Sequence, residues 1–225
     1  SIMLIVAPGC CGRNTSLISS MPEYNDRFFY LMMDETDIVT GRHLKKIPKA
    51  VKEICDCCEK KPSVVMICIT CVDALLGTDM ERVCRKAEEK VDIPVRPCYM
   101  YALTREGRKP PMVHVRQSLY SLLEPQKKKG NVVNLLGFFS PLVDDCEIYE
   151  LLQQAGVKTI HEISRCKDYE EYQTMSEANF NLVLHPEARF AAEDFHDRLK
   201  IPYIELRRLY QIDKIASQYR AFGAA

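Results

Sequence analysis

Short apolar runs alternate along this chain with segments in which apolar residues recur every three or four positions. The runs predict buried β-strands, and the wider spacing predicts helices with one apolar face. In the first half, the pattern predicts strands at 2–7, 28–33, 64–69 and 93–98 and helices at 44–60 and 113–123. A further helix is predicted after Cys71, with an apolar stripe formed by Leu75, Leu76, Met80, Val83 and Cys84.

A polar, charged segment at 124–130, bounded by proline and glycine, predicts a linker in the middle of the chain. After it, the pattern predicts strands at 131–138, 157–160, 180–184 and 202–206 and helices at 145–154, 169–178 and 188–199. Strands that alternate with helices favour a parallel sheet with helices on both faces. The predicted fold class is therefore α/β, with two Rossmann-like domains at 1–127 and 128–225.

Composition limits the classes of partner. The 31 basic and 31 acidic residues balance, so no overall field favours nucleic acid or an anionic membrane surface. No apolar run approaches ~18 residues and no signal-peptide pattern opens the sequence, so we expect no membrane span and a cytoplasmic location. The 11 cysteines are odd in number and several lie in apolar segments, which argues against a disulfide framework. Reduced thiols that bind metal, beside others buried as small apolar side chains, fit better.

Two cysteines stand where a predicted strand passes into a helix. Cys10 lies in the glycine-containing turn at 8–12, and Cys71 comes just after the apolar strand at 64–69. The turns that follow parallel strands share one edge of the sheet, so we expect the two thiols to lie near each other. An iron–sulfur cluster needs four soft donors, and two subunits related by a two-fold axis would supply them.

Four segments carry a resemblance to a known family. Residues 7–13 (APGCCGR) resemble the family's H-G-P-x-G-C turn, and residues 34–54 resemble its acidic turn and the helix that follows. Residues 69–83 resemble T-C-x-x-x-x-I-G-D-D-I, and residues 131–139 resemble the V-N-I-I-G strand of a second Rossmann-like domain. In these segments the chain resembles the component 1 proteins of nitrogenase and the nitrogenase-like reductases, which include dark-operative protochlorophyllide reductase and nickel-sirohydrochlorin reductive cyclase.

The resemblance implies an oxidoreductase subunit that carries a [4Fe–4S]-type cluster at a dimer interface. Carried over by position, Cys10 and Cys71 are its ligands, and Cys11 could substitute for Cys10 or simply pack in the turn. The partner subunit would be identical or paralogous. An ATP-dependent iron protein would supply electrons, which pass on to a small-molecule substrate bound nearby.

The sequence also departs from the family. A further upstream ligand cysteine and a third Rossmann-like domain are not seen, so we expect a short member or a piece of a longer one. Regions that hold the ligands of a molybdenum–iron cofactor are unmatched, so that cofactor is not expected. The turn at 8–12 lacks the G-K-[ST] ending of a phosphate loop, which places ATP on the partner.

Other cysteines have simpler interpretations. Cys68 forms a C-x-x-C spacing with Cys71, which occurs in zinc and redox sites, but strand alternation favours packing of Cys68 in the core. Cys55 and Cys58 lie on the apolar stripe of their helix, with Cys57 beside them, which favours a core or helix-surface role.

Two other function classes fit the same residues. One is a non-catalytic scaffold or carrier that binds a cluster or cofactor without turnover. The other is a ligand-binding module like the metal-chelate receptors, which share a doubly wound, two-domain architecture by fold-level analogy.

Overall fold

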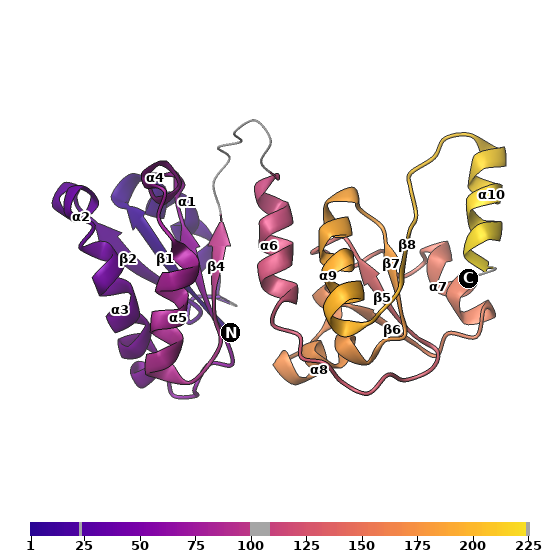
Figure 1. Cartoon of the computed structure of the whole chain (residues 1–225), viewed down its shortest axis with the longest axis horizontal. Coiled ribbons are helices and arrows are strands. Elements are labelled where there is room, and N and C mark those ends of the chain that lie inside the picture. The colour runs from indigo at the N-terminus through magenta and orange to yellow at the C-terminus, as the bar shows by residue number, and fades with distance from the viewer. Residues whose placement is uncertain (23, 100–108, 224–225) are drawn as a thin grey trace. The chain divides into compact units, whose positions relative to one another are not determined.

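The computed structural model describes residues 1–22, 24–99 and 109–223 and divides the chain into two compact units, Ser1–Leu119 and Tyr120–Ala225 (Figure 1). The elements of the first unit are β1 (Ile2–Pro8), α1 (Gly9–Ser19), β2 (Phe28–Met33), α2 (Glu35–Thr40), α3 (His43–Cys57), β3 (Val65–Ile69), α4 (Cys71–Leu76), α5 (Met80–Val91), β4 (Val95–Tyr99) and α6 (Pro111–Tyr120). The elements of the second are β5 (Val132–Leu136), α7 (Glu147–Gln154), β6 (Thr159–Glu162), α8 (Tyr169–Gln173), β7 (Phe180–Val183), α9 (Arg189–Leu199), β8 (Tyr203–Glu205) and α10 (Ile212–Gly223), with 3₁₀ turns at Ile163–Arg165, Thr174–Glu177 and Pro186–Ala188.

In the first unit, the described strands form a parallel sheet in the order β2-β1-β3-β4. Alternate side chains of these strands pack with α3 and α5 into one apolar core, in which Leu4, Ile67 and Val95 meet Ile47 and Ala87. The opposite face of the sheet is covered by α1, which packs against β1 and β2. The predicted α/β class, with helices on both faces of a parallel sheet, is confirmed.

One helix predicted from the apolar stripe is two helices in the structure. Gly77 has a left-handed φ of 67°, which ends α4, and Asp79 caps the new helix α5 by accepting a hydrogen bond from the Arg82 N–H. Leu75 and Leu76 are 65% and 53% exposed, so the predicted stripe was wrong for these two residues. The break occurs because glycine adopts this backbone conformation without the steric cost that a Cβ would bring.

The second unit repeats the architecture of the first. Its described strands form a parallel sheet in the order β6-β5-β7-β8. Val133 and Leu135 face a core that includes Ile148 and Leu152 of α7, and α10 adds Phe222 to it. On the other face, α9 packs against β7 and β8 (Figure 1). The prediction of a second Rossmann-like unit is thereby confirmed as well.

The chain enters the second unit at Tyr120. The ring of Tyr120 packs edge-on against Phe195 of α9 with the centroids 5.1 Å apart, and Arg198 donates hydrogen bonds to the carbonyls of Tyr120 and Leu123. The domain boundary predicted at residue 127 stays a prediction. Within the described residues, no helix is both long and apolar enough to cross a membrane.

Candidate functional site

The strand order reverses at one place in the first unit, between β1 and β3. The chain leaves β1 towards β2 on one side and later returns to place β3 on the other side of β1. At such a switch point, the loops that follow the two strands diverge and leave room for a ligand at the carboxyl edge of the sheet. Val6 of β1 lies opposite Ile69 of β3, so the segments that begin at Gly9 and Thr70 leave this same edge.

Three cysteines meet at this edge. Cys10 and Cys11 lie in the first turn of α1, and Cys71 is the first residue of α4. The Sγ atoms of Cys10 and Cys11 are 3.9 Å apart; Cys10 is exposed, whereas Cys11 and Cys71 are half-buried. Burial and the neighbouring thiols of Cys10 and Cys71 raise the pKa of Cys11. The structure therefore brings together the two predicted ligands and the alternative, Cys11, from the first turns of α1 and α4.

The cysteines sit in a helix rather than in a loop. The sequence predicts a turn at 8–12 between the strand and the helix, but α1 begins at Gly9, directly after β1. That prediction was wrong because the chain passes from strand to helix without intervening residues. As a consequence, Cys10 and Cys11 are consecutive helical residues and their side chains diverge by about 100° around the helix axis.

The thiols at this edge are too few to hold an iron–sulfur cluster by themselves. Among the described residues, no group of three or more His, Cys, Asp and Glu side chains has the arrangement needed to hold a metal ion. Thiolates are the donors that iron–sulfur clusters use, and they reach such a cluster from the ends of elements, as here. The donor set therefore fits half of a cluster site, which a second subunit would have to complete.

Asp73 of α4 belongs to a buried polar pair that the sequence did not reveal. His43 begins α3 and Asp73 lies in α4; their side chains are 1% and 0% exposed, and His43 Nε2 lies 3.0 Å from Asp73 Oδ1. The other ring nitrogen, Nδ1, lies 3.1 Å from the Asp37 carbonyl and donates to it, because a carbonyl oxygen only accepts. Thr78 donates a hydrogen bond of 3.1 Å to the same Asp73 oxygen.

Two polar atoms beside Cys71 have no hydrogen-bond partner among the described residues. They are Thr70 Oγ1 and Asp73 Oδ2, both buried. The spacing of Thr70 and Asp73 would allow a capping box at the start of α4, but Thr70 makes no side-chain cap. The Asp73 carboxylate instead contacts His43 and Thr78.

The hydrogen-bond network of this pair extends towards the surface through Asp37, which is itself buried. Lys46 Nζ lies 2.6 Å from Asp37 Oδ2, and Arg42 Nε donates to Oδ1 at 3.1 Å. The hydrogen bond from Lys46, aided by Arg42 and opposed by burial, lowers the pKa of Asp37. Hydrogen bonds thus link surface cations through Asp37 and His43 to the helix that begins with Cys71.

The remaining predicted core cysteines lie as expected. Cys68 and Cys98 are buried and stand opposite each other in β3 and β4. Contact with Cys98, together with burial, raises the pKa of Cys68. At the end of α3, Cys55 and Cys58 are half-buried and Cys57 is exposed, which agrees with the predicted core or helix-surface role.

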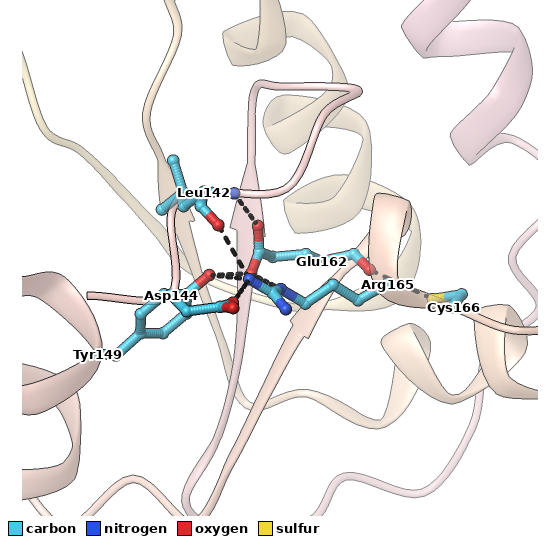
Figure 2. A network of polar contacts seen from close by, with 6 residues as sticks. All are labelled: Leu142, Asp144, Tyr149, Glu162, Arg165 and Cys166. Carbon is cyan, nitrogen blue, oxygen red and sulfur yellow. Dashed lines mark hydrogen bonds and ion pairs between the residues drawn. The ribbon is translucent and has the colours of Figure 1, made fainter. Parts of the chain in front are cut away.

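A second polar network lies at the carboxyl edge of the other sheet (Figure 2). The carboxylate of Glu162, 6% exposed, accepts hydrogen bonds from the Leu142 N–H at 3.0 Å and from the Tyr149 hydroxyl. Arg165 Nε donates to the same carboxylate at 2.9 Å. Arg165 Nη2 donates to the Leu142 carbonyl and to Asp144, at 2.9 and 2.7 Å. This network ties the segment after β5 to the end of β6, and no sequence motif indicated it.

Comparison with known families gives one match over the whole chain. The family described as nitrogenase component 1 type oxidoreductase matches residues 1–225. The nitrogenase iron-molybdenum cofactor biosynthesis protein NifE of a Nostoc species is 28% identical to this chain, and the match covers 98% of the chain and 47% of the relative. NifE of Klebsiella pneumoniae is 26% identical, with 88% and 46% covered. The chain thus spans about half the length of these curated relatives.

Solved structures show the same fold. The structure titled "Nitrogenase Cp1 at pH 5" aligns with a TM-score of 0.66 at 21% identity, over 96% of this chain and 46% of that chain. The structure titled "Nitrogenase Cp1 at pH 6.5" aligns with a TM-score of 0.67 at 19% identity, over 99% and 54%. At these identities the likeness shows the fold alone.

Proposed function

This chain belongs to the nitrogenase component 1 type oxidoreductase family, and we propose that it is the half-site of an iron–sulfur cluster shared with a second subunit. Cys10 and Cys71 are the proposed ligands, with Cys11 as the alternative to Cys10. The cluster is of the [4Fe–4S] type, and the partner is a second copy or a paralogous chain. The proposed oxidoreductase works in the cytoplasm, where thiols stay reduced.

The observation that carries the proposal is the meeting of three thiols at the switch point of the first sheet. Two thiolates from each of two symmetric subunits make the four soft donors that such a cluster requires. Burial and the neighbouring thiols raise the pKa of Cys11, which opposes the loss of its proton that binding iron would require.

Exposed apolar side chains on the two helices that carry the thiols support a subunit interface. Leu75 and Leu76 follow Cys71 in α4 and are 65% and 53% exposed, and Leu17 of α1 is 73% exposed. Large exposed apolar side chains are common on a surface that a partner covers. A covered edge would also keep water from the thiolates, which otherwise oxidise readily.

When bound, such a cluster exchanges single electrons at low potential. The chain's own residues hold it: the thiols bind, and α1 and α4 fix their positions on the sheet edge. The proposed electron donor is a separate ATP-dependent iron protein, and the proposed acceptor is a small molecule bound nearby.

A second candidate function is a cofactor scaffold or carrier. The curated relatives are named as nitrogenase iron-molybdenum cofactor biosynthesis proteins, and this favours a role in assembly for the present chain. In that role the same thiols would hold a cluster, and no small molecule would be turned over. The two candidates share the site and differ in whether electrons leave it.

Anaerobic purification with iron and sulfide analysis tests the site. Cys10→Ala and Cys71→Ala are each expected to lower iron per chain strongly and to remove the cluster's absorption and EPR signals. Cys57→Ala, which changes an exposed cysteine on α3, is the matched control and should leave both unchanged. Retention of the full iron content in both ligand variants would contradict the proposal.

Electron transfer separates the two functions. With a reduced iron protein and ATP, a relay subunit is expected to show a change in the cluster's EPR signal on the timescale of ATP hydrolysis. A scaffold would bind the cluster and show no such change.

A further inference from the structure

The short helix α4 has little apolar anchorage of its own. It spans six residues, Cys71–Leu76, and two of these, Leu75 and Leu76, expose more than half of their surface. Asp73 is the one buried residue of this helix. A helix of this length is not stable by itself in water, so contacts with the rest of the fold must hold it.

Those contacts centre on the Asp73 carboxylate. Its Oδ1 lies 3.0 Å from His43 Nε2 and accepts the Thr78 hydroxyl at 3.1 Å. Thr78 comes two residues after the helix, so His43 is the partner supplied by a different part of the fold, 30 residues away. Because Nδ1 contacts the Asp37 carbonyl and Nε2 contacts the Asp73 carboxylate, the imidazole ring bridges these two groups in one orientation.

Asp73 and Cys71 lie on opposite sides of the same helical turn. Two residues along an α-helix correspond to a rotation of about 200°. The buried side of the turn therefore carries Asp73, and the half-buried outer side carries Cys71. Any movement of the Asp73 anchor rotates or shifts the first turn and the Cys71 sulfur with it.

We infer that His43 is a positioning residue for Cys71, acting through its buried contact with Asp73. The inference deepens the proposed function and rests on it for the cluster, but the position of the Cys71 thiol can be measured without iron. Partners of metal ligands in other proteins act in this way by fixing the orientation of the ligand.

Two amide variants separate the contacts of His43. In His43→Asn the amide nitrogen takes the place of Nδ1, which keeps the bond to the Asp37 carbonyl and removes the contact with Asp73. In His43→Gln the amide nitrogen takes the place of Nε2, which keeps the contact with Asp73 and removes the bond to the Asp37 carbonyl. The exposed pair Lys52–Asp56 lies on the same helix as His43, so Lys52→Gln is the matched control.

The first measurement uses the iron-free chain under reducing conditions. The rate at which iodoacetamide alkylates Cys71, followed by mass spectrometry, is expected to rise several-fold in His43→Asn and to stay near that of the natural chain in His43→Gln and Lys52→Gln. The rate at Cys10, on α1, serves as the internal reference and should not change. Equal Cys71 rates in all four proteins would overturn the inference.

The second measurement uses the iron-loaded protein. His43→Asn is expected to lower iron affinity by about 10-fold, the lower end of what loss of such a supporting contact costs. The cluster that remains should show an altered EPR spectrum and a shifted reduction potential, and His43→Gln should restore both. Unchanged spectrum, potential and affinity in folded His43→Asn would contradict the inference.

A gentler variant covers the case in which His43→Asn does not fold. Thr78→Val keeps the side-chain size and removes the hydroxyl that orients the same Asp73 oxygen; it should raise the Cys71 alkylation rate by a smaller factor, and no rise would count against the inference. If the natural chain binds no iron at all, the proposed function fails, whereas the alkylation rates still decide the role of His43.

Discussion

Lys46 Nζ lies 2.6 Å from Asp37 Oδ2, and this aspartate side chain is only 2% exposed. The hydrogen bond from Lys46 lowers the pKa of Asp37 against the opposing effect of burial. A carboxyl group with a lowered pKa in the folded state stabilises the fold fully above its unfolded pKa, about 3.9. That stabilisation is lost as the pH falls through the lower, folded pKa.

Asp37→Asn is therefore expected to lower the free energy of unfolding at pH 7 and to reduce its dependence on pH below about 4. Urea unfolding followed by circular dichroism at pH 7, 5, 4 and 3 measures both effects. Asp26→Asn changes an exposed aspartate whose ion pair is 4.0 Å long and serves as the control. If the free energy of unfolding depends on pH in the same way in Asp37→Asn and in the natural chain, this account is contradicted.

The buried pair of His43 and Asp73 predicts a strong asymmetry between single and double variants. His43→Leu leaves the Asp73 carboxylate buried without its imidazole partner, and loss of one partner of a buried pair costs about 3–5 kcal/mol. The double variant, His43→Leu with Asp73→Leu, buries no charge and is expected to be more stable than His43→Leu alone. Urea unfolding of the natural chain, the two single variants and the double variant gives the coupling energy between the two side chains. Strictly additive losses of stability would argue against the pair.

The cysteines should differ sharply in reactivity. Burial raises the pKa of Cys84 to about 12, so at pH 8 about one in 10⁴ of its thiols is ionised. Exposed Cys57 should react with iodoacetamide in the folded chain, whereas Cys84, Cys68 and Cys98 should react only after unfolding in urea. Peptide mapping by mass spectrometry compares the two conditions, and rapid labelling of Cys84 in the folded chain would contradict its burial in the core.

Much of the fold follows from the apolar pattern. The strand predicted at 28–33 coincides with β2, and the one at 2–7 ends one residue before β1 does. Errors arose where backbone geometry overrides the pattern, as at Gly77, which splits one predicted helix into two. The predicted helix at 169–178 likewise becomes α8 and a 3₁₀ turn, a change that apolar spacing does not encode.

The predicted linker at 124–130 also illustrates the limits of local reasoning. Its composition indicates a solvated segment, yet Lys128 Nζ donates to the Ser176 carbonyl, and burial lowers the pKa of this lysine. The Glu124 N–H donates to the side chain of Gln173. These partners lie about 50 residues away, and the identity of a distant partner is set by the tertiary fold.

The candidate site, like the fold, could be predicted from the sequence only in part. The positions of Cys10 and Cys71 after strands place them at one sheet edge, and this could be deduced because parallel strands all end on the same side. The contribution of Cys11 depends on α1 beginning at Gly9. The contact between His43 and Asp73 could not be predicted from the sequence, because each residue by itself resembles an ordinary surface residue. Ligation by Cys10, Cys71 or Cys11 stays a prediction.

The network around Glu162 predicts that one carboxylate fixes the segment after β5. Glu162→Leu leaves the Leu142 N–H without its buried acceptor and should lower the free energy of unfolding by about 1–3 kcal/mol, the cost of an unsatisfied buried donor. Amide hydrogen exchange at Leu142 should become faster, because its N–H donates directly to the carboxylate. Arg198→Gln, on another helix of the same unit, is the comparison for overall loss of stability. If Glu162→Leu lowers stability but leaves exchange at Leu142 slow, the carboxylate does not hold this segment.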